Sequence, residues 1–159
     1  MELEFDVSMT LQALYDYNMY HTYTSPSGIL GTAAGALFLV VYASDHRFMY
    51  LLAALVLILY TPVTLFTRSW KHIKLNPVYK KPYHVRMDEE GVTITQGEQE
   101  LQVGWEDCMM ARSSNQSILL YTGKKLAWIF PKASLKENKV KLIEMISTHM
   151  PPEKVKIKQ

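Results

Sequence analysis

Cysteine is almost missing from this chain, and so are the residue clusters that carry most enzyme chemistry. The single cysteine, Cys108, excludes a disulfide within the chain and fits a reducing compartment. The five histidines are scattered, and none shares metal-ligand spacing with a cysteine or an acidic residue. No glycine-rich phosphate loop is present either. We therefore expect no metal, no cofactor and no catalytic residue. Cys108 is interpreted as a small buried apolar side chain in a chain that is not an enzyme.

Charge is absent from two long stretches, residues 28–44 and 49–67, which only a short polar link separates. A bilayer core about 30 Å thick requires roughly 20 apolar residues in a helix. The second stretch has that length, and the first reaches it if the helix begins at Pro26. A buried hairpin of a soluble protein would show a polar face on each helix, and neither stretch has one. Residues 28–67 are thus predicted to form a transmembrane hairpin, without the charged side chains of an ion or proton pathway.

Basic residues are rare before the hairpin and common after it. Residues 1–67 hold one Arg and five acidic residues, whereas residues 68–159 hold 16 Lys and Arg and ten acidic residues. The positive-inside rule then places the C-terminal part in the cytoplasm, and two spans bring the N-terminus to the same side. The sequence predicts a multi-pass protein of the cell membrane with both termini cytoplasmic.

A basic juxtamembrane linker is predicted over residues 68–82. Its cationic side chains could attract anionic lipids of the inner leaflet or an acidic partner, and its aromatic side chains suit the interface. Alternatively, the lysines only fix the orientation of the hairpin. The candidate contact residues are Trp70, Lys71, Lys74, Tyr79, Lys80 and Lys81.

Small residues in the first span predict a close helix contact. Gly28, Gly31 and Gly35 would let a second helix approach closely within lipid. This face could hold a second copy of the chain or another membrane protein, but packing against the chain's own second span is favoured.

The N-terminal segment, residues 1–27, is predicted to contain a strand and an interfacial helix. Residues 3–9 alternate between apolar and polar side chains, which is typical of a half-buried strand. A lone strand cannot satisfy its backbone hydrogen bonds, so it should complete a sheet built from the C-terminal part. Residues 11–23 form the predicted helix, with Thr10 as its N-cap and four tyrosines suited to the headgroup layer.

Residues 83–150 show the pattern of a small antiparallel β-meander followed by a helix. About six short strands alternate with turns, and a helix is predicted over residues 135–149, capped by Ser134 and Glu137. Residues 151–159 are predicted to be a mobile tail. The fold class is therefore an α+β membrane protein, with a two-helix transmembrane hairpin before the meander and its C-terminal capping helix.

Four short motifs follow one another along the chain: Asn76-Pro77, Asp88-Glu89-Glu90-Gly91, Trp105-Glu106 and Ile129-Phe130-Pro131-Lys132. In this order they resemble the YcxB-like family of small bacterial membrane proteins. The resemblance implies a C-terminal domain with a fold like that of pleckstrin-homology (PH) domains: a curved antiparallel sheet capped by a helix. It implies no catalytic residue.

Two functions remain open from the sequence. The chain could be a membrane-anchored binding or scaffold module that recruits a partner or anionic lipid at the inner leaflet. It could instead be an accessory or regulatory subunit of a larger membrane complex, such as a transporter, engaged through the hairpin. Nucleic acid is not an expected partner, because Lys132, Lys136, Lys139 and Lys141 are more simply a solvated helix face.

Overall fold

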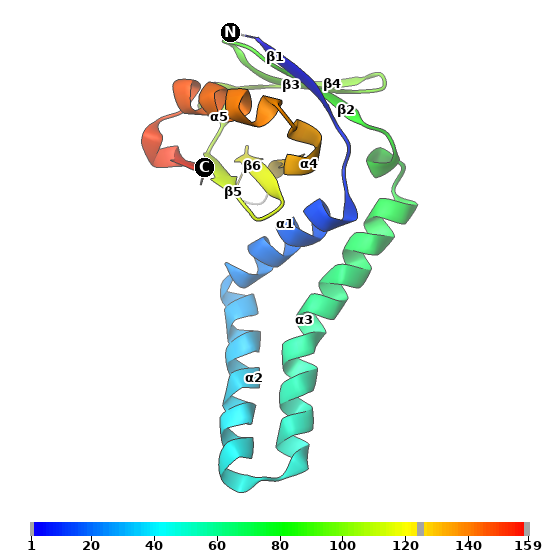
Figure 1. Ribbon diagram of the computed structural model, residues 1–159, viewed down its shortest axis with the longest axis vertical. Coiled ribbons are helices and arrows are strands. Elements are labelled where there is room, and N and C mark those ends of the chain that lie inside the picture. Colours follow the sequence, from blue (N-terminus) through cyan, green and yellow to red (C-terminus); the bar gives the residue numbers. More distant parts are fainter. Residues whose placement is uncertain (1, 124–125, 158–159) are drawn as a thin grey trace.

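Two long helices form a hairpin that projects away from a β-rich domain (Figure 1). The computed structural model describes residues 2–123 and 126–157. Helix α2 spans Pro26–Asp45 and helix α3 spans Phe48–Leu75. Both are long and apolar enough to cross a membrane. The Ser25 side chain caps the start of α2, and His46 ends it in the left-handed region at φ 53°.

Helix α3 is longer than the predicted span and continues through the first half of the predicted 68–82 linker. The helix persists because one of its faces is still buried there. Ser69 is fully buried, and its Oγ accepts a hydrogen bond of 2.9 Å from Asn18 Nδ2. A 3₁₀ helix, Pro77–Lys80, follows directly, so only a few residues of the predicted linker are irregular.

The predicted N-terminal strand and helix are both present. Strand β1 spans Leu3–Val7 and helix α1 spans Leu11–Tyr23, with the Thr10 side chain accepting from the Ala13 amide as an N-cap. β1 pairs antiparallel with β2, Tyr83–Met87, and therefore completes a sheet of the C-terminal part.

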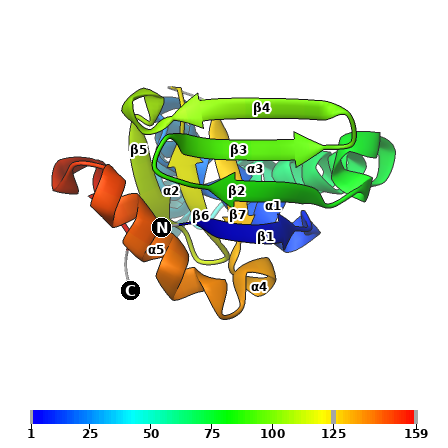
Figure 2. The same cartoon turned by 90° about the horizontal axis from the view of Figure 1, so that it is seen from above.

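The six predicted strands of the meander are present, but they lie in two sheets rather than one. The first sheet has the order β1-β2-β3-β4, with β3 at Gly91–Gln96 and β4 at Gln99–Gly104. A 3₁₀ turn at Trp105–Asp107 ends this sheet. The second sheet has the order β7-β6-β5-β8, and its strands cross beneath those of the first (Figure 2). The bounds of its meander strands are Met110–Ser113 for β5, Ser117–Tyr121 for β6 and Ala127–Pro131 for β7.

The C-terminal helix is divided, contrary to prediction. A short helix α4, Lys132–Leu135, is followed by a break at Lys136, where φ is 44°, and then by α5, Asn138–His149. The predicted capping box does not form. Instead, Ser134 Oγ lies 3.4 Å from the Ser8 amide nitrogen and 3.3 Å from the Ser8 carbonyl oxygen, so it ties α4 to the end of β1.

The predicted mobile tail is folded onto the domain as far as residue 157. Pro152–Lys154 form a 3₁₀ helix and Val155–Lys156 form strand β8, which pairs parallel with β5. The tail is held because Val155 and Ile157 pack against the main core. Residues 158 and 159 of the predicted tail lie outside the described residues.

Two apolar clusters hold the domain together. The larger one lies between the two sheets and α5. The smaller one lies between α1 and the opposite face of the second sheet, where Ala13 and Leu14 meet Leu119 and Ile129. Helix α1 is therefore a structural part of the domain as well as the approach to α2.

Candidate functional site

The structure separates the predicted contact residues instead of gathering them. Trp70 and Lys74 lie together on α3, where the Lys74 Nζ sits 4.4 Å from the centroid of the Trp70 ring. Both side chains are exposed. A cation stacked on an indole ring at the end of an apolar helix is suited to contact lipid headgroups at a membrane surface.

Lys71 faces a different hollow. Together with Arg68 and His72 it borders a cleft of about 630 Å³ formed where the end of α1, the start of α2 and helix α3 meet. The remaining wall is largely hydroxyl-bearing, including Thr22, Tyr60, Thr61, Thr64 and Thr67. This cleft is cationic and lies at the end of the apolar hairpin.

Tyr79 is better described as a packing residue than as a contact residue. Its side chain is half-buried against the smaller cluster, and its ring lies 6.4 Å from that of His72. Lys80 and Lys81 beside it are exposed. The Gln96 side chain donates to the carbonyl oxygens of Val78 at 2.6 Å and Lys81 at 3.0 Å, which fixes this short segment to the first sheet.

The three glycines of α2 have three different surroundings. A Cβ at Gly35 would lie 2.6 Å from Ile58 Cγ1 of α3, so this glycine permits the close approach of the two helices. A Cβ at Gly28 would meet the Thr22 carbonyl at the end of α1. A Cβ at Gly31 would meet nothing within 4 Å. The favoured interpretation, packing within the chain, therefore holds for Gly35 and not for Gly31.

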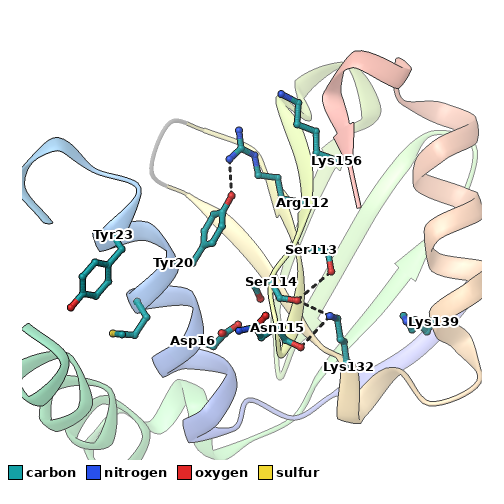
Figure 3. Close-up of a pocket in the computed structure, with 11 residues that line it drawn as sticks. Asp16, Tyr20, Tyr23, Arg112, Ser113, Ser114, Asn115, Lys132, Lys139 and Lys156 are labelled. Carbon is teal, nitrogen blue, oxygen red and sulfur yellow. Dashed lines mark hydrogen bonds between the residues drawn. The ribbon is translucent and has the colours of Figure 1, made fainter. Parts of the chain in front are cut away.

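A second and larger cleft, of about 830 Å³, lies between α1 and the second sheet (Figure 3). Helix α1 forms one wall, the β5–β6 turn forms the floor, and α4, α5 and β8 supply the other side. We call it the cationic cleft. Its lining residues are Asp16, Met19, Tyr20, Tyr23, Arg112, Ser113, Ser114, Asn115, Lys132, Lys139 and Lys156.

Two of its cations are positioned by hydrogen bonds. Arg112 Nη1 donates to the Tyr20 hydroxyl at 2.7 Å and so joins β5 to α1. Lys132 Nζ donates to the carbonyl oxygens of Ser114 at 2.6 Å and Asn115 at 3.1 Å, and so closes the β5–β6 turn. On the opposite wall, Asp16 Oδ2 accepts from the Gln116 amide at 3.1 Å. These hydrogen bonds fix α1 and the β5–β6 turn relative to each other across the cleft.

The charge of the cationic cleft is strongly positive. Arg112, Lys132, Lys139 and Lys156 contribute four positive charges and Asp16 one negative charge, which leaves +3. Among the described residues, none of these four cations lies within ion-pair distance of a carboxylate. Such a surface favours anionic ligands.

Cys108 lies apart from both clefts and is fully buried in the main core. Its Sγ is 3.6 Å from the Gly104 carbonyl oxygen, and burial, assisted by Asp107, raises the thiol pKa to about 11. A thiol that stays protonated at neutral pH is a poor nucleophile. His84 lies apart from Cys108, on the outer face of the first sheet, where its Nδ1 is 2.9 Å from Asp6 Oδ1.

The family comparison covers part of this architecture. The family model for YcxB-like protein matches residues 88–146. Over these residues the chain is similar to that family. The resemblance predicted from the sequence is therefore confirmed here, over β3 to β7, α4 and most of α5. No curated protein and no solved structure matches the chain.

The segment that matches the family model contains three cations of the cationic cleft, Arg112, Lys132 and Lys139, while Lys156 follows it. Sequence reasoning missed this cleft, although it noted Lys132 and Lys139 as a cationic helix face. The missing information was the pairing of β8 with β5, which places Lys156 opposite Arg112. A two-residue strand in a polar tail carries too little periodicity to predict that pairing.

Proposed function

We propose that the chain is a membrane-anchored, PH-like binding or scaffold module of the inner leaflet, with both termini in the cytoplasm. The apolar surface of the hairpin supports insertion. Leu30 is 70% exposed and Val40 is 64% exposed, and most of their neighbours on α2 and α3 are also uncovered by the rest of the chain. Large uncovered apolar surfaces of this kind require a lipid or protein environment. The proposal includes no catalytic step.

The observation that carries the proposal is the way α1 fastens the domain to the end of the hairpin. On one side α1 packs on the second sheet through Leu14. On the other side Asn18 bonds to the buried Ser69 of α3, and the Tyr15 and Phe66 rings pack edge to face at 5.8 Å. The domain therefore does not swing on a flexible tether. An inserted hairpin would hold the cationic cleft, and also the cleft that Lys71 borders, next to the headgroups.

Topology is tested by cysteine labelling in intact cells, with the native Cys108 replaced by Ala. A reagent confined to the outside should label His46→Cys in the α2–α3 link and should not label Glu153→Cys. The reverse pattern, or labelling of both positions, would contradict the proposed orientation. Extraction of the chain from membranes by alkaline carbonate would contradict insertion itself.

A contact role for the juxtamembrane lysines is tested by Lys71→Gln, Lys74→Gln, Lys80→Gln and Lys81→Gln together. Arg68 is kept in this quadruple variant. A separate charge-control variant carries Ser147→Lys on the domain surface. Adding one Lys next to Arg68 preserves the orientation signal of the quadruple variant. If these lysines bind anionic lipid or an acidic partner, association should fall and become less dependent on salt. Unchanged association would leave them as an orientation signal.

The alternative, an accessory subunit of a larger membrane complex, is favoured by one feature of α2. Gly31 is not used by packing within the chain, so it is free to admit a helix of another protein. Gly31→Leu should then abolish copurification of a membrane partner, whereas Ala33→Leu, at an exposed position of the same helix, serves as a matched control. Equal copurification of both variants would remove this alternative.

A further inference from the structure

We infer that the cationic cleft binds a phosphate-bearing anion, presented either on a lipid headgroup or on a soluble phosphate compound. The site is separate from the juxtamembrane lysines. Only the headgroup source depends on the proposed membrane anchoring, because a soluble phosphate compound could reach the cleft of an unanchored chain as well.

The first argument is an unrelieved repulsion between neighbouring strands. Arg112 of β5 and Lys156 of β8 are register partners in the parallel pair, and both line the cleft. Like charges placed opposite each other across two strands destabilise the pair. A carboxylate between them would remove this repulsion, but no ion pair to either residue is found within residues 2–123 and 126–157. An anion held between these two side chains would supply the missing charge.

The second argument is the number of donors that remain unused. A guanidinium has five N–H donors, and Arg112 uses one on the Tyr20 hydroxyl and one on the Met110 sulfur. Because the Tyr20 oxygen accepts from Arg112, its own proton can be donated into the cleft. Lys132 spends two donors on the β5–β6 turn, and Lys139 adds a further ammonium from α5. On the acceptor side, Asp16 is the one carboxylate among the described residues of the lining, and its Oδ2 accepts from the Gln116 amide.

Phosphate fits this arrangement better than a single carboxylate. It carries up to two negative charges and several acceptor oxygens, and the planar Arg fork matches its geometry. A cleft of about 830 Å³ also exceeds the volume that one small anion fills, so the phosphate should belong to a larger headgroup or compound. The cleft extends to Tyr23, the last residue of α1, and α2 begins three residues later at Pro26. A headgroup at the membrane surface therefore lies within reach of this end.

The test uses the full chain in phosphatidylcholine nanodiscs, titrated with inorganic pyrophosphate by calorimetry. The double variant Lys139→Gln and Lys156→Gln should weaken pyrophosphate binding by at least about tenfold and reduce its salt dependence. The matched control, Lys136→Gln with Lys141→Gln, removes the same charge at exposed positions outside the cleft lining and should bind pyrophosphate like the unsubstituted chain. Lys139→Gln alone should give an intermediate affinity, without altering the β5–β8 pair.

The two phosphate sources are separated by repeating the titration in nanodiscs that contain phosphatidic acid. If a lipid headgroup occupies the cleft, phosphatidic acid should compete and raise the apparent Kd for pyrophosphate. That competition should vanish in the cleft variant and persist in the Lys136 and Lys141 control. If the ligand is a soluble phosphate compound, the affinity for pyrophosphate should be the same in both lipid compositions.

Three results would overturn the inference: no pyrophosphate binding by the unsubstituted chain, equal binding by the cleft variant, or equal loss in the control pair. Binding of an acidic peptide with the same lysine dependence, without pyrophosphate binding, would assign the cleft to a protein partner instead. Pyrophosphate binding is also measured in detergent, where no bilayer is present. Pyrophosphate binding therefore still tests the cationic cleft if the hairpin does not insert into a membrane.

Discussion

The two sheets of the domain differ in how many of their faces are covered. Strand β2 of the first sheet alternates between buried and exposed residues, whereas all five residues of β6 in the second sheet are buried. The first sheet has one face against the core and one face in solvent. The second sheet has the main core on one face and helix α1 on the other. Helix α1 therefore belongs to the domain as much as to the hairpin.

The N-terminal segment serves both sheets, in two different ways. β1 extends the first sheet beyond β2 and buries Leu3, Phe5 and Val7 in the main core. A few residues later, α1 covers the second sheet. The domain is therefore completed by residues that precede the hairpin in the chain, and both sheets depend on the N-terminus lying on the same side as the C-terminal part.

The largest expected effect concerns the contact between the sheets. Phe5 of β1 is 7% exposed and its ring packs edge to face against Phe130 of β7 at 5.9 Å. Phe5→Ala should lower the free energy of unfolding by about 3–5 kcal/mol, because it leaves a cavity in the main core. The matched control is Phe48→Ala, at a 67% exposed position at the start of α3, which should change it by less than about 1 kcal/mol. Urea titration of the full chain in detergent, followed by tryptophan fluorescence, measures both.

An intact stability of Phe5→Ala would show that β1 contributes no core to the first sheet. The same conclusion would follow if residues 83–159 alone unfolded at the same urea concentration as the full chain. We expect that fragment to be destabilised, since it lacks both β1 and α1.

A somewhat smaller effect separates the two sheets directly. Leu119 of β6 is fully buried beneath α1, whereas Leu101 of β4 is 52% exposed at the edge of the first sheet. Leu119→Ala should destabilise the chain by about 2–5 kcal/mol, and Leu101→Ala by less than about 1 kcal/mol. The same urea titrations compare them. Equal losses would mean that α1 does not cover the second sheet in solution.

Sequence reasoning predicted the elements well wherever periodicity and caps agreed. The alternation of residues 3–9 and the Thr10 cap identified β1 and α1, and the uncharged runs identified α2 and α3. It missed the features that depend on tertiary contacts. The split of the meander into two sheets follows from a turn at Trp105, whose indole nitrogen donates to the Asp88 carbonyl at 2.8 Å. The break between α4 and α5 follows from the attachment of Ser134 to β1.

The candidate site was less predictable than the fold for a physical reason. Nearness in sequence grouped the juxtamembrane lysines, but the Lys74 side chain lies over the Trp70 ring, whereas Lys71 borders the cleft beside Arg68. The cationic cleft collects side chains that are far apart in sequence, since Asp16 and Lys156 belong to opposite ends of the chain. Only the docking of α1 and β8 on the same sheet brings them together, and neither contact leaves a local signal.

The smallest expected effect concerns a side-chain hydrogen bond between the two sheets, which Tyr83 donates. Tyr83 Oη of β2 donates to the Ile129 carbonyl of β7 at 2.6 Å, and burial, assisted by the nearby Tyr79, raises the Tyr83 pKa above its usual value of 10. Because the folded state holds this proton more tightly, the stabilisation is complete below about pH 10 and is lost as the pH rises from there toward the folded pKa. Tyr83→Phe should destabilise the chain by about 1 kcal/mol at neutral pH. The difference between the two chains should shrink by roughly 1 kcal/mol when urea titrations at about pH 9 and about pH 11 are compared. A difference that stays constant over this range would mean that Tyr83 is solvated, and that its hydrogen bond does not join the two sheets.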